Sequence, residues 1–251
     1  MHKILANTIF LGKNVIYLPE CHSTNDVAMQ KFKSGEAPEG TIVITDKQTK
    51  GRGQRGNQWL SQPKMNLTFS LILTPVFLDA SEQFGLNMAV SLGIREALSE
   101  YVPGIMVKWP NDILHEENSK IGGILIENSV TNKGIELAVV GVGLNINQTE
   151  FPFSKAASIA QLAGAPVNKE EVFKTIISRI EKYYIILRKR GQSVLREMYR
   201  PHLYRFGEWS TYNDGEEFTG RIMDVSEQGK LIIEKMDNSI RHYSFQEVRF
   251  V

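Results

Sequence analysis

Residues 135–147 read IELAVVGVGLNIN, and this segment decides between two possible folds, a mixed α+β sheet and a dinucleotide-binding fold. Apolar residues run without interruption from Leu137 to Val140, which predicts a buried strand over Ile135–Val142. Gly141 and Gly143 follow at alternate positions and superficially suggest a dinucleotide fingerprint. That fingerprint also requires a third glycine and a following helix, and both are missing. The segment therefore predicts a core strand and lends little support to a Rossmann fold.

Further strands and helices are predicted on both sides of this segment. Apolar runs predict strands over Thr41–Thr45, Leu67–Leu73, Ile105–Trp109 and Ile124–Glu127. Helical spacing of apolar residues predicts helices from Ser23 to Gly35, over Glu82–Tyr101, over Lys169–Arg190 and over Ser193–Tyr199. Ser23 and Asp26 suggest a capping box, Asn168 is a suitable N-cap, and Gly191 fits a left-handed helix end. Interleaved elements of this kind predict an α+β domain with a mixed β-sheet flanked by helices.

The sequence pattern changes after about residue 204. Glycines and the turn Asn213-Asp214-Gly215 separate short alternating segments such as Arg221–Val225 and Lys230–Lys235. This spacing is typical of a small β-barrel. A module of this size builds little core alone, so we expect it to pack against the main domain. We therefore divide the chain into a main domain, residues 1–203, and a small β domain, residues 204–251.

Composition argues against several classes of protein. Apolar residues make up 42% of the 251 residues and charged residues 23%, which argues against disordered and fibrous chains. The net charge of +1 is too small a surplus for a dedicated DNA-coating surface. The single Cys21 excludes an internal disulfide and every motif built on cysteine pairs. We find no signal peptide and no apolar run long enough to span a membrane, so the sequence predicts a cytoplasmic protein.

A loop rich in glycine and arginine, residues 50–59 (KGRGQRGNQW), carries the first functional signal. Its glycines let the backbone approach an anion, and Arg52 can grip a carboxylate or phosphate through two parallel hydrogen bonds. The same composition suits a solvated loop or a nucleic-acid-binding loop, so the loop alone leaves these interpretations open. It is not a Walker loop, because the spacing G-x-x-x-x-G-K-[ST] is absent.

Two further segments place polar groups at strand ends. In KWPND (108–112), Pro110 ends the strand and holds Asn111 and Asp112 on a turn, where they suit a hard cation or a base. An ordinary Asn-Asp turn explains the same pattern. In KIGG (120–123), Lys120 precedes a glycine pair and could reach over a ligand that presses against bare backbone. A surface lysine at the start of a strand is the alternative interpretation.

The order and spacing of five segments resemble those of biotin protein ligases, the enzymes that attach biotin to a lysine of a carrier protein. The segments are STN (23–25), GRGQRGNQW (51–59), KWPND (108–112), KIGGIL (120–125) and GVGLNIN (141–147). The resemblance covers nearly the whole chain, because residues from about 205 onward look like that family's SH3-like C-terminal domain. It implies a class II synthetase-like catalytic domain over residues 1–203 and a small SH3-like β domain over 204–251, in the short form without an N-terminal DNA-binding domain.

The resemblance also implies roles for individual residues. The residues expected to bind biotin are Ser23, Thr24, Asn25, Gln48, Arg52, Gly53, Gln54, Trp59, Lys120 and Gly123. The residues expected to bind ATP are Arg52, Lys108, Asn111, Asp112, Lys120 and Asn145. Within these sets Lys120, Arg52 and Asp112 are expected to be catalytic, and Asp112 is also the expected magnesium ligand. Gln54 stands where many family members carry arginine, so we expect weaker retention of the adenylate. Gln246 stands where glycine is frequent, and this difference affects only a turn in the small domain.

The implied reaction has two steps. The biotin carboxylate attacks the α-phosphate of ATP and expels pyrophosphate, while Arg52, Lys120 and Mg²⁺ stabilise the charge on the phosphoryl oxygens. A lysine of the biotin carboxyl carrier protein, from acetyl-CoA carboxylase or a similar carboxylase, then attacks biotinyl-5'-AMP and releases AMP. That amine, with a pKa near 10.4, must first lose a proton, so Asp112 is the candidate base, with action through the metal alone as the alternative. The loop around Arg52 should order with ligand and shield the anhydride from water.

Other functions remain open from the sequence. A lipoate ligase would share the fold and the adenylate chemistry, whereas a lipoyl transferase would need a core cysteine nucleophile, and Cys21 is better explained as a small apolar residue. A biotin-responsive DNA-binding regulator needs a helix-turn-helix domain, which does not fit ahead of the first predicted strand at Thr41, so we expect no DNA partner. A non-catalytic biotin-binding module would tolerate replacement of Lys120 and Arg52. Monomer and homodimer both remain open.

Overall fold

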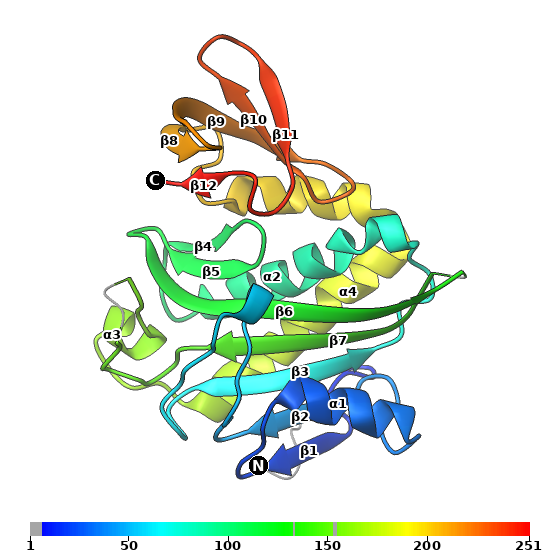
Figure 1. The fold of residues 1–251 in the computed structure, drawn as a ribbon. Helices are drawn as coiled ribbons and strands as arrows, with labels where there is room; N and C mark the ends of the chain where they lie inside the picture. Colours follow the sequence, from blue (N-terminus) through cyan, green and yellow to red (C-terminus); the bar gives the residue numbers. More distant parts are fainter. Residues whose placement is uncertain (1–6, 133, 153–154) are drawn as a thin grey trace.

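The computed structural model describes residues 7–132, 134–152 and 155–251, and it contains two β-sheets (Figure 1). The strands of the first sheet are β1 (Val15–Leu18), β2 (Ile42–Thr45), β3 (Leu67–Leu73), β4 (Ile105–Lys108), β5 (Asp112–His115), β6 (Ser119–Thr131) and β7 (Gly134–Leu144). They lie in the order β1-β2-β3-β7-β6-β5-β4, and within the described residues only β1 and β2 pair in parallel. The mixed sheet confirms the predicted α+β class.

The second sheet is antiparallel and formed by the C-terminal part of the chain. Its strands are β8 (Trp209–Asn213), β9 (Glu217–Val225), β10 (Leu231–Lys235), β11 (Ile240–Tyr243) and β12 (Arg249–Phe250), in the order β11-β10-β9-β8-β12. A small antiparallel sheet of this kind agrees with the expected SH3-like module. Its buried residues, among them Tyr212 and Ile233, join the same hydrophobic cluster as Phe69 and Ile180 of the larger part. The expectation that the module packs against the main domain is therefore confirmed.

Helices cover both faces of the large sheet (Figure 1). The α-helices are α1 (Thr24–Lys33), α2 (Phe84–Leu98), α3 (Ile159–Ala163) and α4 (Lys169–Tyr199), and the short 3₁₀ turns are η1 (Gln54–Gly56), η2 (Ala80–Glu82) and η3 (Arg200–His202). Helix α1 packs on β2, β3 and β7, while α2 lies between α4 and the other face of the sheet.

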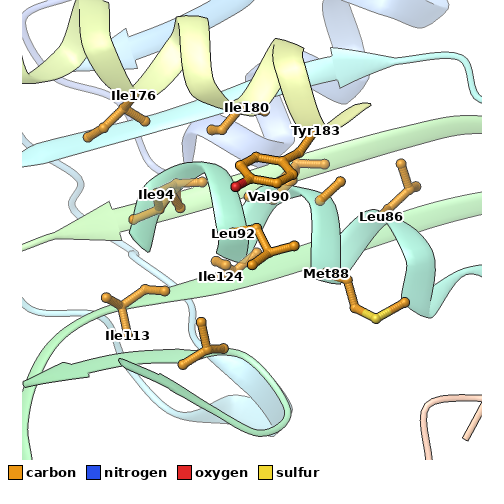
Figure 2. Close-up of a cluster of buried hydrophobic side chains, with 14 of the residues drawn as sticks. Leu86, Met88, Val90, Leu92, Ile94, Ile113, Ile124, Ile176, Ile180 and Tyr183 are labelled. Atoms are coloured by element: carbon orange, nitrogen blue, oxygen red, sulfur yellow. The ribbon is translucent and has the colours of Figure 1, made fainter. Parts of the chain in front are cut away.

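The position of α2 explains why it is apolar on nearly all sides. In Figure 2 its side chains meet Ile180 and Tyr183 of α4 on one side and Ile113 and Ile124 of the sheet on the other. A helix enclosed in this way buries most of its circumference instead of one stripe. This layer fixes the back of the sheet, so that ligand-binding groups can be presented on the α1 face.

The predicted ends of α4 are confirmed, and so is the end of α1 at Gly35, which follows the helix with φ 75°. The capping box predicted at the start of α1 is wrong. The Asn168 side chain accepts hydrogen bonds from the backbone N–H groups of Glu170 and Glu171. Gly191 has φ 79° and ψ 174°, and it interrupts α4 where the sequence predicts a helix end. In α1, by contrast, the Ser23 side chain makes no capping hydrogen bond, so the predicted capping box does not form. Asp26 instead binds Arg52.

Most predicted strands are present, with shifted ends. The strand over Leu67–Leu73 matches end to end, whereas β4 ends at Lys108 and β6 and β7 extend into a long hairpin. The prediction that the first core strand begins at Thr41 is wrong, because β1 precedes it. Among the described residues, no helix is long and apolar enough to cross a membrane.

Candidate active site

A cavity of about 560 Å³ lies where the start of α1, the 48–59 loop, the 108–112 turn and the strands β6 and β7 meet. All residues predicted to bind biotin line it: Ser23, Thr24, Asn25, Gln48, Arg52, Gly53, Gln54, Trp59, Lys120 and Gly123. So do five of the six residues predicted to bind ATP: Arg52, Lys108, Asn111, Asp112 and Lys120. Segments far apart in the sequence thus meet around one cavity.

Asn145 is the predicted site residue that does not line this cavity. It is buried, and its Nδ2 donates hydrogen bonds to the backbone oxygens of Lys120, at 3.4 Å, and Ala157, at 3.2 Å. In this structure Asn145 therefore holds the backbone beneath Lys120. Its expected contact with the nucleotide stays a prediction.

Part of the cavity wall is a cluster of hydrogen-bonding groups around Thr24 and Asn25. The backbone N–H and the hydroxyl of Thr24 both donate to Gln48 Oε1, at 2.8 and 3.1 Å. The Ser70 hydroxyl lies 2.7 Å from Thr24 Oγ1 and 2.6 Å from Asn25 Oδ1. Asn25 Nδ2 donates to Glu127 Oε2 at 2.7 Å. Each side chain is held by another, so the cluster is organised to bind a neutral polar ring.

Sequence reasoning missed Ser70 and Glu127. Ser70 is fully buried within β3, a strand recognised by its apolar neighbours, and a single serine there gives no functional signal. Glu127 lies in β6 and binds two predicted site residues, Asn25 and Arg52. A carboxylate directly after the apolar run 124–126 was the only available signal.

The alternating glycines of β7 create space for two site residues. A Cβ atom at Gly141 would lie 2.4 Å from Asn25 Oδ1, and one at Gly143 would lie 2.4 Å from Trp59 Cε2. Both distances are far below van der Waals contact, so any larger residue would require Asn25 or Trp59 to move. The glycines that suggested a dinucleotide fingerprint thus serve close packing around this cavity. Trp59 Nε1 is buried and has no hydrogen-bond partner in the described part of the chain.

Arg52 lies at the edge of the cavity between two carboxylates. Its Nη2 is 2.6 Å from Asp26 Oδ1 and 3.2 Å from Glu127 Oε2. The side chain is 45% exposed, and ion pairs this accessible contribute little to stability. An anionic ligand can therefore compete for the guanidinium at small cost.

The cavity wall also carries an ion pair on the β5–β6 hairpin. Lys120 Nζ lies 2.7 Å from Asp112 Oδ1. Gly123 pairs with Asp112 in register, and a Cβ there would come within 3.7 Å of Lys120 Nζ. Asn111 Nδ2 donates to the Ile124 carbonyl at 2.7 Å, and Ile124 N–H donates back to the Asn111 carbonyl. The turn is thus clamped to β6, and the ion pair faces open space beside bare backbone.

The small C-terminal sheet also contributes to the cavity. Burial lowers the pKa of Lys108, partly opposed by the nearby Asp112 carboxylate, and the Lys108 ammonium lies 4.8 Å from the centre of the Phe250 ring. Phe245 lines the cavity as well. Trp109 Nε1 donates to the Gly229 carbonyl at 2.9 Å, which links the 108–112 turn to the second sheet. These contributions had no signal in the sequence, because they depend on how the two parts dock.

Comparison with known proteins agrees with this geometry. Residues 17–145 match the biotin/lipoate A/B protein ligase family. The chain is 31% identical to the bifunctional ligase/repressor BirA of Bacillus subtilis over 94% of this chain and 74% of the relative. It is 25% identical to the biotin–[acetyl-CoA-carboxylase] ligase of Mycobacterium tuberculosis over 84% of this chain and 80% of that protein.

A solved structure extends the similarity to the whole fold. The biotin protein ligase of Aquifex aeolicus, in complex with biotin and ATP, superposes with a TM-score of 0.77 at 28% identity. The match covers 95% of this chain and 100% of that one, so both sheets are included. With a family match that includes the cavity residues between Ser23 and Gly143, the chain belongs to the biotin/lipoate A/B protein ligase family.

Proposed function

We propose that this protein activates biotin with ATP to biotinyl-5'-AMP and transfers the biotinyl group to a lysine of a biotin carboxyl carrier protein. The observation that carries the proposal is the distribution of charge in one cavity. The hydrogen-bonding groups of Thr24 and Asn25 suit a ureido ring, and the cations that line the same cavity suit a carboxylate and a phosphate. The bound biotin and ATP of the Aquifex aeolicus relative support this assignment.

The first step requires cations around the reacting phosphate. Arg52, Lys108 and Lys120 all line the cavity, and their charges can stabilise the phosphoryl oxygens while biotin attacks. In this structure Lys120 pairs with Asp112 and Arg52 pairs with Asp26, at partly exposed positions. We infer that the substrate carboxylate and α-phosphate replace Asp112 and Asp26 as their partners.

Magnesium fits the site through a single protein carboxylate. Among the described residues that line the cavity, Asp112 is the only acid, and no cluster of three potential ligands occurs in the described part of the chain. Magnesium bound with nucleotides commonly uses one or two carboxylates together with phosphate oxygens and water. Asp112, with Asn111 beside it, would hold such an ion, which would supply positive charge to the phosphates.

Asp112 is also placed for the second step. The carrier lysine attacks the acyl carbon, the bond between that carbon and the phosphate oxygen breaks, and AMP leaves with the electron pair. The amine must first lose a proton, and Asp112 is the only carboxylate among the described residues that line the cavity. Lys120 would then stay with the departing phosphate.

The proposal extends to organisation and location. We assign catalysis to residues 1–203 and closure of the cavity to the SH3-like domain, 204–251, because Phe245 and Phe250 line it. The carrier is expected to be that of acetyl-CoA carboxylase or a related carboxylase, since two relatives are named as ligases of acetyl-CoA carboxylase. A cytoplasmic location and the absence of a DNA partner rest on composition and the small net charge. A homodimer remains compatible with the chain.

Biotin-dependent exchange of labelled pyrophosphate into ATP tests the proposal. We expect exchange with biotin, none with lipoate, and a large loss in Lys120→Ala. Exchange with lipoate alone would agree with the family assignment and contradict biotin as the substrate. No exchange with either acid, in a protein that still binds biotin, would favour a binding module and exclude the catalytic roles.

A further inference from the structure

Four positive side chains lie around the β4–β5–β6 part of the large sheet, and two of them have no role above. Lys108 is the last residue of β4 and Lys120 lies at the start of β6, and both line the cavity. Lys155 and Arg205 do not line it, but they belong to segments that flank these strands.

Lys155 is joined to Lys120 through the backbone. The Lys120 N–H donates to the Lys155 carbonyl at 2.7 Å, and the Ala157 N–H donates to the Lys120 carbonyl at 3.0 Å. Asn145 adds a further link, since its side chain donates to the carbonyls of Lys120 and Ala157. The Lys155 side chain is exposed and forms no ion pair with a described residue. Its ammonium is therefore available to a ligand.

Arg205 is joined to the end of β4 in a similar way. The Tyr204 N–H donates to the carbonyl of Val107, the residue before Lys108, at 2.9 Å. The Arg205 guanidinium donates to the Val251 backbone oxygen at 3.0 Å and pairs with no carboxylate of the described residues. Because a guanidinium has five N–H donors and this side chain is partly exposed, most of its donors are available to a ligand.

The electrostatics of Lys108 show that these charges act on one another. Burial lowers the pKa of Lys108, whereas the Asp112 carboxylate raises it. Repulsion by three further cations lowers this pKa as well, and these are Arg205, Lys120 and Lys155. Asp112 is the only anion among these groups, and it already pairs with Lys120 at 2.7 Å. The cluster is strongly positive, and an anion of high charge would stabilise it.

ATP brings the complementary charge. The adenylation proposed above leaves the α-phosphate beside Arg52 and Lys120 and releases the β- and γ-phosphates as pyrophosphate. Ammonium and guanidinium groups form strong, charge-assisted hydrogen bonds to phosphate oxygens. A polyphosphate chain that runs from the α-phosphate past Lys108 and out of the cavity meets the two remaining cations.

We propose that Lys108, Lys155 and Arg205 bind the β- and γ-phosphates of ATP and stabilise the departing pyrophosphate. A biotin carboxylate oxygen bonds to the α-phosphorus, the bond from that phosphorus to the bridging oxygen breaks, and the electron pair leaves with pyrophosphate. The three cations stabilise the charge that this group gains. Since Lys155 and Arg205 do not line the cavity, pyrophosphate can leave while the adenylate stays. This inference rests on the proposed ligase function.

The substitutions Lys155→Gln and Arg205→Gln test the proposal, because each removes one charge and leaves the residues of the cavity wall unchanged. We expect the KM for ATP in biotin adenylation to rise about tenfold or more in each variant, the effect of losing a hydrogen bond to a charged group. Inhibition by inorganic pyrophosphate should weaken by a similar factor. Inhibition by AMP, which has no β-phosphate, should stay at the wild-type level.

Transfer from synthetic biotinyl-5'-AMP to a purified carrier domain separates phosphate binding from a structural role. The adenylate has no β- or γ-phosphate, so both Gln variants should transfer biotin at the wild-type rate. Lys155→Arg and Arg205→Lys keep the charge and should restore most of the affinity for pyrophosphate. Arg190→Gln, at an exposed position of α4, removes a charge outside the cluster and is the matched control.

The outcomes distinguish the inference from the function beneath it. Wild-type inhibition by pyrophosphate in both Gln variants would overturn the phosphate site while the ligase function stands. So would an equal weakening of inhibition by AMP, an equal loss in transfer from the synthetic adenylate, or the same change in Arg190→Gln. If the wild-type protein forms no biotinyl-5'-AMP from biotin and ATP, the ligase function is overturned, and the phosphate site with it.

Discussion

Alanine at position 143 should impair the site while it leaves the sheet intact. Gly143 lies within β7, where a Cβ atom would be 2.4 Å from Trp59 Cε2 and 2.7 Å from Nε1. Ordinary contact begins at 3.4 Å, so the indole must move by about 1 Å. A displacement of about 1 Å in a substrate-positioning group can cost roughly 100-fold in rate.

The same substitution should have little effect on stability. Glycine within a strand is unfavourable relative to alanine by roughly 0.5–1 kcal/mol, which offsets part of the steric cost. The Trp59 side chain is half-buried and lies on a loop, so the indole can move. We therefore expect a change within about 1 kcal/mol in the free energy of unfolding by urea, and a 10- to 100-fold loss of kcat/KM in biotin-dependent pyrophosphate exchange.

A double-mutant cycle with Trp59→Ala shows whether the effect passes through the indole. When the Trp59 indole is absent, the added methyl group has space. Gly143→Ala should therefore cause no further loss of activity in the Trp59→Ala background. An equal loss in both backgrounds would refute the proposed contact. A loss of several kcal/mol in stability would show that alanine disturbs the sheet itself.

Three further predictions concern other parts of the structure. Lys120→Met should reduce the rate of adenylation by about 100- to 1000-fold. The melting temperature should change little, because the Lys120 side chain is 41% exposed and an ion pair this accessible adds little stability. A large fall in the melting temperature together with the loss of activity would contradict a catalytic role. Trp109→Phe removes the donor to Gly229 and should destabilise by about 1 kcal/mol in calorimetry; an unchanged curve would argue against this link. Burial, the largest single influence, raises the pKa of Glu96, but hydrogen bonds from Lys182 and Tyr183 and the charges of Lys182 and Arg179 together outweigh it and hold that pKa below its usual 4.5. This stability is therefore present above pH 4.5 and lost as pH falls through the lowered pKa. Glu96→Gln should melt below wild type at neutral pH and converge with it in acid; a constant difference would contradict the assignment.

The sequence predicted the long elements well and the short ones poorly. Leu67–Leu73 is a continuous apolar run, and the strand matches it end to end. β1 and β5, of four residues each, were not predicted, although β2 and β4, of the same length, were. At Ser23 a capping pattern was present, but its side chain makes no cap hydrogen bond and Asp26 pairs with Arg52 instead.

The candidate site was predictable where its residues lie in motifs. Arg52, Asp112 and Lys120 are conspicuous because glycine or proline beside them has no role in a regular strand or helix. Ser70 and Phe250 were not predictable, because an apolar strand and a chain terminus give no sign of a distant cavity. Asn145 shows the opposite limit: it lies in a motif, but the structure places it beneath Lys120 and outside the cavity.

Formation of biotinyl-5'-AMP in a single turnover is the most direct test of the proposed chemistry. Protein in excess would be mixed with biotin and ATP, quenched, and the nucleotides separated by chromatography. We expect biotinyl-5'-AMP and pyrophosphate in equal amounts from the wild-type protein, and almost none from Lys120→Met. Lipoyl-AMP from lipoate with no biotinyl-5'-AMP from biotin would contradict the substrate, and no acyl-adenylate from either acid would contradict the reaction.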